Sequence, residues 1–180
     1  GDNASEGVTY TFRELELPEG LTPVRAAAGG EGVLLAASSF EIVEEDGAER
    51  AKFGAWLLGY DAETGAYRSL CTLETGGSPD VLVSGMAADG DIWLLISRRG
   101  EASGEVLQRL SAEGALLGEW PLELLSGDGY VSGLAAASGR LCLLCQVERG
   151  AQLRVFSFES GEPELIGTEE LPRDAIISGS

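Results

Sequence analysis

Short runs of apolar residues alternate with small polar turns along the whole chain. Three runs are almost entirely apolar, and each follows a turn rich in small or polar residues; they cover Val33–Ser38, Ile92–Ser97 and Leu141–Gln146. Such runs, bounded by residues that tolerate a positive φ, are typical of buried strands joined by hairpins. Few windows hold apolar residues at helical spacing, and 26 glycines are spread along the chain. The pattern therefore predicts an all-β fold.

A short motif recurs before the apolar runs. Val83-Ser84-Gly85-Met86-Ala87 is matched by Val131-Ser132-Gly133-Leu134-Ala135 and by Ile177-Ser178-Gly179, with the serines 48 and then 46 residues apart. A more distant copy lies at Val24–Ala28. In each complete unit the motif predicts a first strand and the apolar run a second, followed by a third strand and a fourth. The fourth strands are expected at 67–73, 116–124 and 164–171.

Four antiparallel strands repeated at this period are typical of β-propeller blades. We expect a single partial β-propeller-like domain over residues 1–180, with three whole blades at about 22–80, 81–129 and 130–175. Residues 8–18 alternate like the outer strand of a preceding blade, and 176–180 resemble the start of a following one. A closed propeller needs at least four blades, so three would leave an incomplete ring with open edges. Either the chain is a segment of a longer protein, or its edges pair with a second copy.

One turn resembles a known family. Tyr60-Asp61-Ala62-Glu63-Thr64-Gly65 is similar to the Tyr-Asp-x-x-Thr-Gly turn between the third and fourth strands of bacterial propellers of the quinoprotein-like and WD40-like groups. The corresponding turns at Ser111–Gly114 and Ser157–Gly161 have diverged from that pattern. The resemblance implies a fold and no activity, and quinone binding does not follow from it. Such blades also resemble those of secreted bacterial lipoproteins, which implies an extracytoplasmic location, with a cytoplasmic one as the alternative.

Composition and charge exclude several classes of function. The chain has 30 acidic and 12 basic side chains, for a net charge of −18, which argues against nucleic acid and anionic membrane surfaces as partners. No window approaches 18 uninterrupted apolar residues, so no membrane insertion is expected. Histidine is absent, which excludes Ser-His-Asp and Cys-His nucleophile systems and zinc sites built on histidine.

The cysteines predict no metal or cofactor. Cys142 and Cys145 have the spacing of a redox or zinc half-site, but residues three apart on a strand point to opposite faces, beyond disulfide reach. Cys71 is the only other thiol, too few for a zinc site with four ligands. We therefore interpret these cysteines as structural residues.

No catalytic residue is predicted. The expected first strands contain no Asp or Glu, the residues that propeller glycosidases place there. The acidic insert Glu44–Arg50 is expected to project as a solvated loop, and Trp56, Trp93 and Trp120 to pack between blades. The recurring serines are the candidate binding residues, because they could line a channel: Ser84, Ser132 and Ser178.

These observations favour a non-catalytic binding or scaffolding module of an extracytoplasmic bacterial protein. It would bind a protein, a peptide or a glycan through the loop faces of the blades. One alternative is part of a propeller hydrolase whose catalytic residues lie on blades outside this chain. Another is a homo-oligomer in which the open edges of two chains complete one ring.

Overall fold

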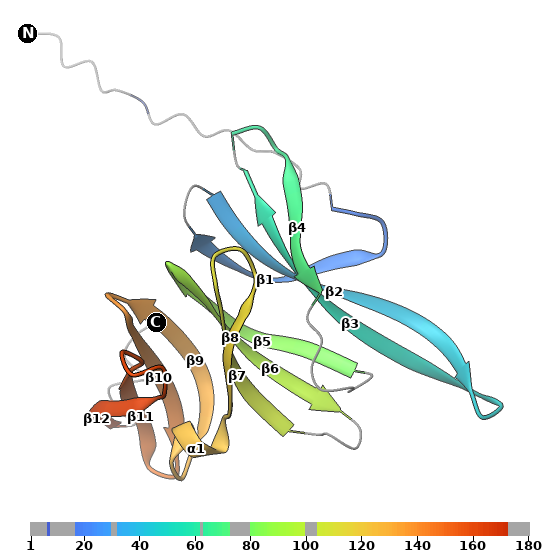
Figure 1. Cartoon of the computed structure of the whole chain (residues 1–180). Coiled ribbons are helices and arrows are strands. Elements are labelled where there is room, and N and C mark those ends of the chain that lie inside the picture. The colour runs from blue at the N-terminus through green and yellow to red at the C-terminus, as the bar shows by residue number, and fades with distance from the viewer. Residues whose placement is uncertain are drawn as a thin grey trace, which may run out of the picture.

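The chain folds into three antiparallel sheets of four strands each (Figure 1). This arrangement, seen in a computed structural model, confirms the prediction of an all-β protein. Within every sheet the strands pair in the order in which they occur along the chain. The structure describes residues 7, 17–29, 32–61, 63–72, 80–99 and 104–172.

Each sheet is a meander built from one segment of the chain. The first sheet consists of β1 (Leu21–Gly29), β2 (Gly32–Glu45), β3 (Ala48–Tyr60) and β4 (Tyr67–Thr72). The second consists of β5 (Asp80–Asp89), β6 (Asp91–Arg99), β7 (Gly104–Leu110) and β8 (Leu116–Pro121). The third consists of β9 (Tyr130–Ala137), β10 (Arg140–Val147), β11 (Gly150–Ser157) and β12 (Glu164–Pro172). The expected strand at 8–18 falls outside the described residues apart from positions 17 and 18, which are not in a strand, and 176–180 lie wholly outside them.

The strand expected over 116–124 is too long. β8 ends at Pro121, and a single helical turn, α1 (Glu123–Ser126), follows it. The backbone N–H of Leu122 still donates to the carbonyl oxygen of Glu105 on β7 at 2.9 Å, and the carbonyl oxygen of Leu122 accepts from Leu125 and Ser126, which begins the helical turn. Leu122 and Leu125 turn inward and are 5% and 2% exposed. The apolar residues that suggested a longer strand therefore cap the core as a helical turn.

The three sheets contact one another through their first strands, with β1 beside β5 and β5 beside β9. The Nε of Arg25 on β1 donates to the carbonyl oxygen of Ser84 on β5 at 3.2 Å. A Cβ at Gly85 would lie 2.7 Å from the side chain of Leu134 on β9, so the close approach of β5 and β9 requires a small residue here. The carboxylate of Asp89 accepts a hydrogen bond from the backbone N–H of Gly139 at 2.9 Å.

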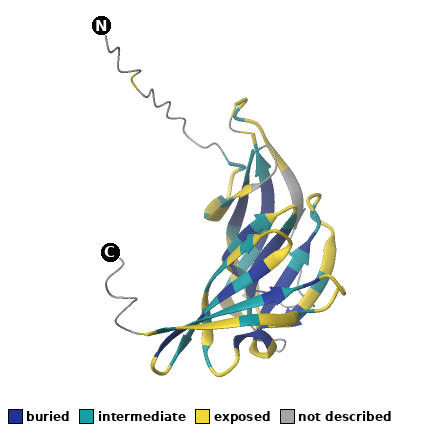
Figure 2. Ribbon diagram, turned by 90° about the vertical axis from the view of Figure 1, so that its left-hand side faces the viewer, coloured by how far each residue is buried: buried dark blue, intermediate teal, exposed yellow. Residues whose placement is uncertain are grey.

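Two hydrophobic clusters fill the spaces between neighbouring sheets, as the buried residues in Figure 2 indicate. Alternate residues of β6 point to opposite faces, so Leu94 packs against the first sheet and Leu95 against the third. The second sheet is thus covered on both faces, which explains why β6 is apolar from Ile92 to Ile96. The prediction that the tryptophans pack between sheets is confirmed for Trp93 and Trp120, which are 3% and 8% exposed. It is wrong for Trp56, which is half-buried and points to the face of the first sheet opposite Ala55 and Leu57.

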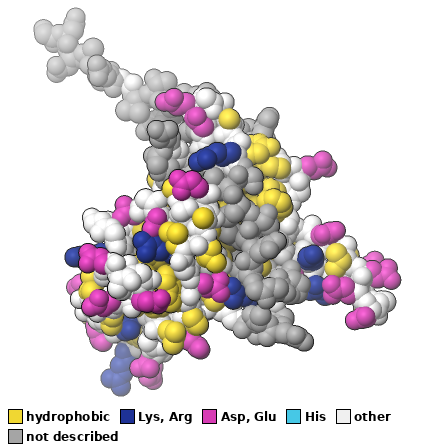
Figure 3. Space-filling model, in the orientation of Figure 1, with side chains coloured by type: hydrophobic (Ala, Val, Ile, Leu, Met, Phe, Trp, Pro, Cys, Tyr) yellow, Lys and Arg dark blue, Asp and Glu magenta, His cyan; other side chains and the backbone are white. Residues whose placement is uncertain are grey.

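The acidic insert does not form a loop. β2 and β3 extend as paired strands to Glu45 and Ala48 and project from the body as a hairpin, here called the arm (Figure 1). The turn is Asp46-Gly47, with φ of 54° and 77°, the sequence that tight hairpins favour. Acidic side chains gather over the arm (Figure 3): Glu41, Glu44, Glu45, Asp46 and Glu49.

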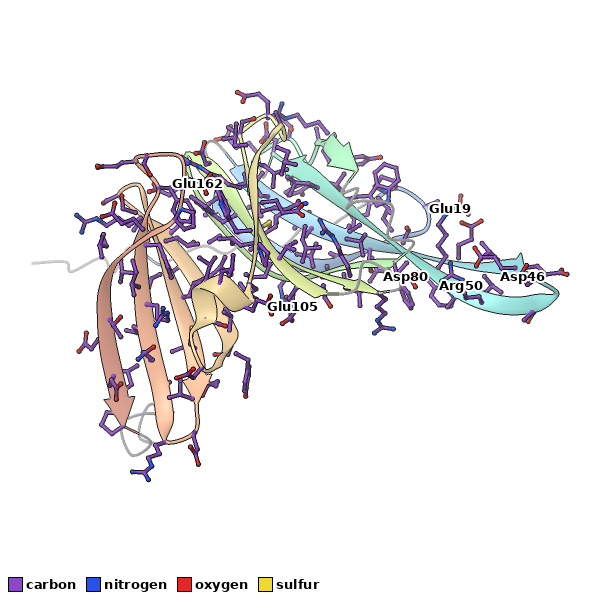
Figure 4. The ribbon with its side chains drawn as sticks, turned by 60° about the horizontal axis from the view of Figure 1, so that its bottom comes forward. Glu19, Asp46, Arg50, Asp80, Glu105 and Glu162 are labelled. Carbon is purple, nitrogen blue, oxygen red and sulfur yellow. The ribbon has the colours of Figure 1, made fainter. Side chains whose placement is uncertain are left out.

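The arm is attached to the second sheet by Asp80, which is 8% exposed. Its carboxylate accepts hydrogen bonds from the backbone N–H of Phe53 at 3.0 Å and from Arg50 at 3.1 Å. Figure 4 shows Arg50 and Asp80 together where the arm leaves the body, with Asp46 near its far end. No helix among the described residues is long and apolar enough to cross a membrane.

Candidate functional site

The candidate binding serines lie at β-bulges. The pairing between β5 and β6 slips at Ser84, and that between β9 and β10 slips at Ser132. The hydroxyl of Ser84 donates to the carbonyl oxygen of Leu95 at 3.4 Å, and that of Ser132 to Leu144 at 3.3 Å. Each hydroxyl therefore bonds a backbone carbonyl where the ladder is disrupted, and this accounts for the recurrence of serine. Ser178 lies outside the described residues.

The cysteines of β10 lie on opposite faces of the third sheet, as predicted. Cys145 is fully buried in the cluster between the second and third sheets, whereas Cys142 is half-buried on the other face. Both thiols are free, and burial raises the pKa of each. A raised pKa lowers the thiolate fraction, so neither thiol is activated as a nucleophile. Within the described part of the chain, no group of three or more potential metal ligands occurs.

A polar cluster lies on the face of the second sheet that meets the first. Glu119 on β8 accepts hydrogen bonds from Arg98 on β6 and, at 2.8 Å, from the amide of Gln108 on β7. Burial raises the pKa of Glu119, but the bonds from Arg98 and Gln108 outweigh it and hold the pKa below its usual value. Gln108 is 2% exposed, so within this cluster solvent reaches only the side chains of Arg98 and Glu119. The carboxylate of Glu119 is satisfied by both neighbours, whereas the Nε of Arg98 is buried without a hydrogen-bond partner. The cluster therefore links three neighbouring strands of the second sheet.

Glu119 should make stability depend on pH. Its pKa is lower in the folded than in the unfolded state, so its contribution is complete above the unfolded value and is lost as the pH falls through the folded one. We expect the free energy of unfolding of the native chain to exceed that of Glu119→Gln at pH 7. The difference should shrink below about pH 5. Urea titrations of both proteins between pH 7 and pH 3 measure it; a difference that does not change with pH would contradict the assignment.

An open groove of about 720 Å³ lies between the first and second sheets, at the end where the turns after β3, β5 and β7 meet. The first sheet lines it with Tyr60, Asp61, Tyr67 and Arg68. Of the paired residues, Arg68 points its side chain toward the second sheet, whereas Tyr60 and Tyr67 point to the other face, where Tyr60 packs against Leu35 and Leu58. The wall of the groove on the second sheet is small or apolar: Ala88, Gly90, Ile92 and Ala112. Tyr67 is 44% exposed, and the carboxylate of Asp61 accepts the backbone N–H groups of Glu63 and Thr64 at 2.8 and 3.2 Å.

The corresponding space between the second and third sheets is filled. The ring of Phe158, just after β11, lies with its centroid 4.5 Å from that of Trp93 and 5.1 Å from that of Trp120. The guanidinium of Arg109 lies 5.1 Å from the Trp93 centroid and 5.9 Å from that of Phe158. Its charge is balanced by Asp91, at 2.7 Å. Rings, cation and carboxylate together close this interface.

The strand pairing shows which residues of the two interfaces correspond. The first strand of each of the first two sheets has a bulge, and the residue after it lies opposite Ala36 in the first sheet and Leu95 in the second, so these two residues correspond. Counting back two residues along each second strand, Leu34 corresponds to Trp93. Leu34 pairs with Gly59, and Trp93 pairs with Arg109. Gly59 therefore corresponds to Arg109.

In the fourth strands, β4 and β8, the positions of arginine and glycine are reversed. Gly59 pairs with Arg68, whereas Arg109 pairs with Gly118. A Cβ at Gly59 would lie 3.3 Å from the Nε of Arg68, so the arginine lies across the glycine. Both interfaces thus have one arginine over the third and fourth strands of the sheet. In the groove it is Arg68 of β4, and in the filled interface it is Arg109 of β7.

The other large residues of the filled interface have small counterparts in the groove. Ile92 pairs with Leu110 and Leu141 with Phe156, so Ala112 corresponds to Phe158, two residues further on. Gly32 and Asp91 each lie two residues before Leu34 and Trp93, so Gly32 corresponds to Asp91. Cys71 corresponds to Trp120, because Leu57 pairs with Cys71 as Leu107 pairs with Trp120. The groove is therefore an interface between repeats that lacks the three rings and the carboxylate of the filled interface and keeps the cation.

The sequence pattern did not predict this groove. Tyr60 and Asp61 were predicted only as part of the resembling turn, and no site was predicted at Tyr67, Arg68 or Ala112. A signal was present, because the aligned turns place Ala112 where the third repeat has Phe158. Comparisons of the chain with protein-family models, curated proteins and solved structures gave no match.

Proposed function

We propose that the three sheets are consecutive blades of a β-propeller-like fold and that the chain is a non-catalytic binding module. Sequential pairing within each sheet and the contacts of β1 with β5 and of β5 with β9 support the blade arrangement. The resemblance of the turn at Tyr60–Gly65 to those of bacterial propellers supports assignment to an extracytoplasmic bacterial protein.

The groove between the first two sheets carries this proposal. Its volume of about 720 Å³ lies within the range of small-molecule and peptide sites. It combines apolar walls with the guanidinium of Arg68 and the backbone groups of the turns, and sites of this composition bind peptides and glycans through apolar contacts and hydrogen bonds. Turns at the ends of rigid sheets also hold their side chains in place before a ligand arrives.

The test is to fill the groove from within. Ala112→Phe places a ring where the neighbouring interface has Phe158. Isotope-labelled protein is titrated with short peptides and with oligosaccharides while backbone amide shifts are recorded. We expect a ligand of one of these classes to shift the amides of Gly59, Ala66 and Gly90, and Ala112→Phe to abolish the shifts.

Ala115→Phe is the matched control, because Ala115 is exposed in the same turn and does not line the groove. This variant should bind like the native chain. If no peptide or oligosaccharide shifts the groove amides, or if both variants bind equally well, the proposed function is wrong.

A homo-oligomer is a second candidate, because the third sheet has a half-buried apolar face. Leu144 on this face corresponds to Leu95, which is 3% exposed between the second and third sheets. A second copy could cover the face as the third sheet covers Leu95.

A further inference from the structure

We propose that the groove receives a peptide segment that carries one aromatic and one acidic side chain. This proposal rests on the groove being the ligand site and adds the chemistry of the ligand. It follows from the filled interface between the second and third sheets, which shows what packs against this framework when the space is occupied.

The aromatic side chain follows from the missing rings. In the filled interface the ring of Phe158 is held between Trp93 and Trp120 and faces the guanidinium of Arg109. In the groove, Ala112 and Leu34 stand in place of Phe158 and Trp93 and leave an apolar space between the first and second sheets. Arg68 keeps a guanidinium over the same strand pair, where it can face an incoming ring as Arg109 does.

The acidic side chain follows from the missing carboxylate. Arg109 is neutralised by Asp91, but Gly32 stands in that position beside the groove. Asp61 is held by the backbone of its own turn. Among the described residues Arg68 forms no ion pair. A ligand carboxylate would therefore supply the partner that the chain supplies to Arg109.

The occupant of the filled interface is itself a peptide segment, residues 157–161, which read Ser-Phe-Glu-Ser-Gly. This segment supplies the buried ring, whereas Glu159 is exposed and the carboxylate at Arg109 is that of Asp91. The groove volume of about 720 Å³ leaves room for the residues on either side of a bound ring. A peptide segment fits both observations better than an isolated ring does.

The probe is the peptide acetyl-Ser-Phe-Glu-Ser-Gly-amide, titrated against the full chain at physiological salt, where the Debye length of about 8 Å limits repulsion by the net charge of −18. We expect shifts of the groove amides and a dissociation constant at least about tenfold weaker when the peptide phenylalanine is replaced by alanine. Replacing its glutamate by glutamine should weaken binding about three- to tenfold.

Two variants of the chain assign these effects. Ala112→Phe should abolish binding, whereas Ala115→Phe should leave it unchanged. In Arg68→Gln the peptides with glutamate and glutamine should bind equally, because the cation that tells them apart is gone. A thermal unfolding curve like that of the native chain confirms that each variant is folded.

The outcomes separate the ligand class from the site. If the alanine peptide binds as well as the phenylalanine peptide, or if glutamate and glutamine remain distinguishable in Arg68→Gln, the proposed ligand chemistry is wrong. If an oligosaccharide shifts the groove amides and this peptide does not, the site stands and the peptide is wrong. If no ligand shifts these amides, both proposals are wrong.

Discussion

Replacing Phe158 by alanine is expected to lower the free energy of unfolding by about 3–5 kcal/mol, the usual cost of removing a large buried aromatic side chain. Phe158 is 3% exposed and contacts both Trp93 and Trp120. Its loss would leave Arg109 and its carboxylate partner beside a cavity. Urea denaturation followed by tryptophan fluorescence measures the change, and also reports on the surroundings of the two indoles.

Phe40→Ala is the matched control, since it removes the same ring from the arm, where Phe40 is 59% exposed. Phe40 packs edge-on against Phe53 with ring centroids 5.4 Å apart, so its removal should cost no more than about 1 kcal/mol. If the two variants lost similar stability, Phe158 would not close the interface between the second and third sheets.

The residues that predicted the fold are those whose structural role shows in the sequence of their own strand. The apolar runs of β2, β6 and β10 are buried between other strands, so burial shows directly in their composition. The motif around Ser84 and Ser132 predicted two first strands for the same reason, because a bulge is repeated with the sequence that forms it. These signals required no knowledge of how the sheets pack.

The arm and the end of β8 show where local patterns mislead. Glu44–Arg50 is acidic, which suggested a solvated loop, yet paired strands can be fully solvated when their backbone bonds are satisfied. The Asp46-Gly47 turn was the stronger signal. At Leu122–Ser126 the apolar residues suggested a strand, but a helical turn after Leu122 buries both Leu122 and Leu125, which a strand with alternating side chains would not do.

The groove could not be predicted from any single segment, because it depends on differences between repeats. Gly59 and Ala112 look unremarkable in the sequence and acquire meaning only when they are compared with Arg109 and Phe158. That comparison needs the strand register, including the bulges that shift it. Position-by-position comparison of repeats is therefore the way to find binding sites in such chains.

Adjacent leucines of β10 should differ sharply in their contribution to stability. Leu143 is fully buried between the second and third sheets, so Leu143→Ala is expected to cost about 2–5 kcal/mol. Leu144 points to the opposite face, where it is half-buried, and Leu144→Ala should cost only about 1 kcal/mol if that face is free. The same side chain is removed in both variants, so the difference reports the surroundings of each.

Concentration distinguishes a free face from a covered one. If a second copy covers the third sheet, the chain should be a dimer in light scattering. Its unfolding midpoint should then rise with protein concentration, and Leu144→Ala should reduce both effects. If the native chain is a monomer with a midpoint independent of concentration, the homo-oligomer is wrong. A cost for Leu144→Ala as large as that for Leu143→Ala in such a monomer would mean that this face is packed within the chain itself. The two leucines therefore test, on one strand, whether the third sheet ends the molecule or begins an interface.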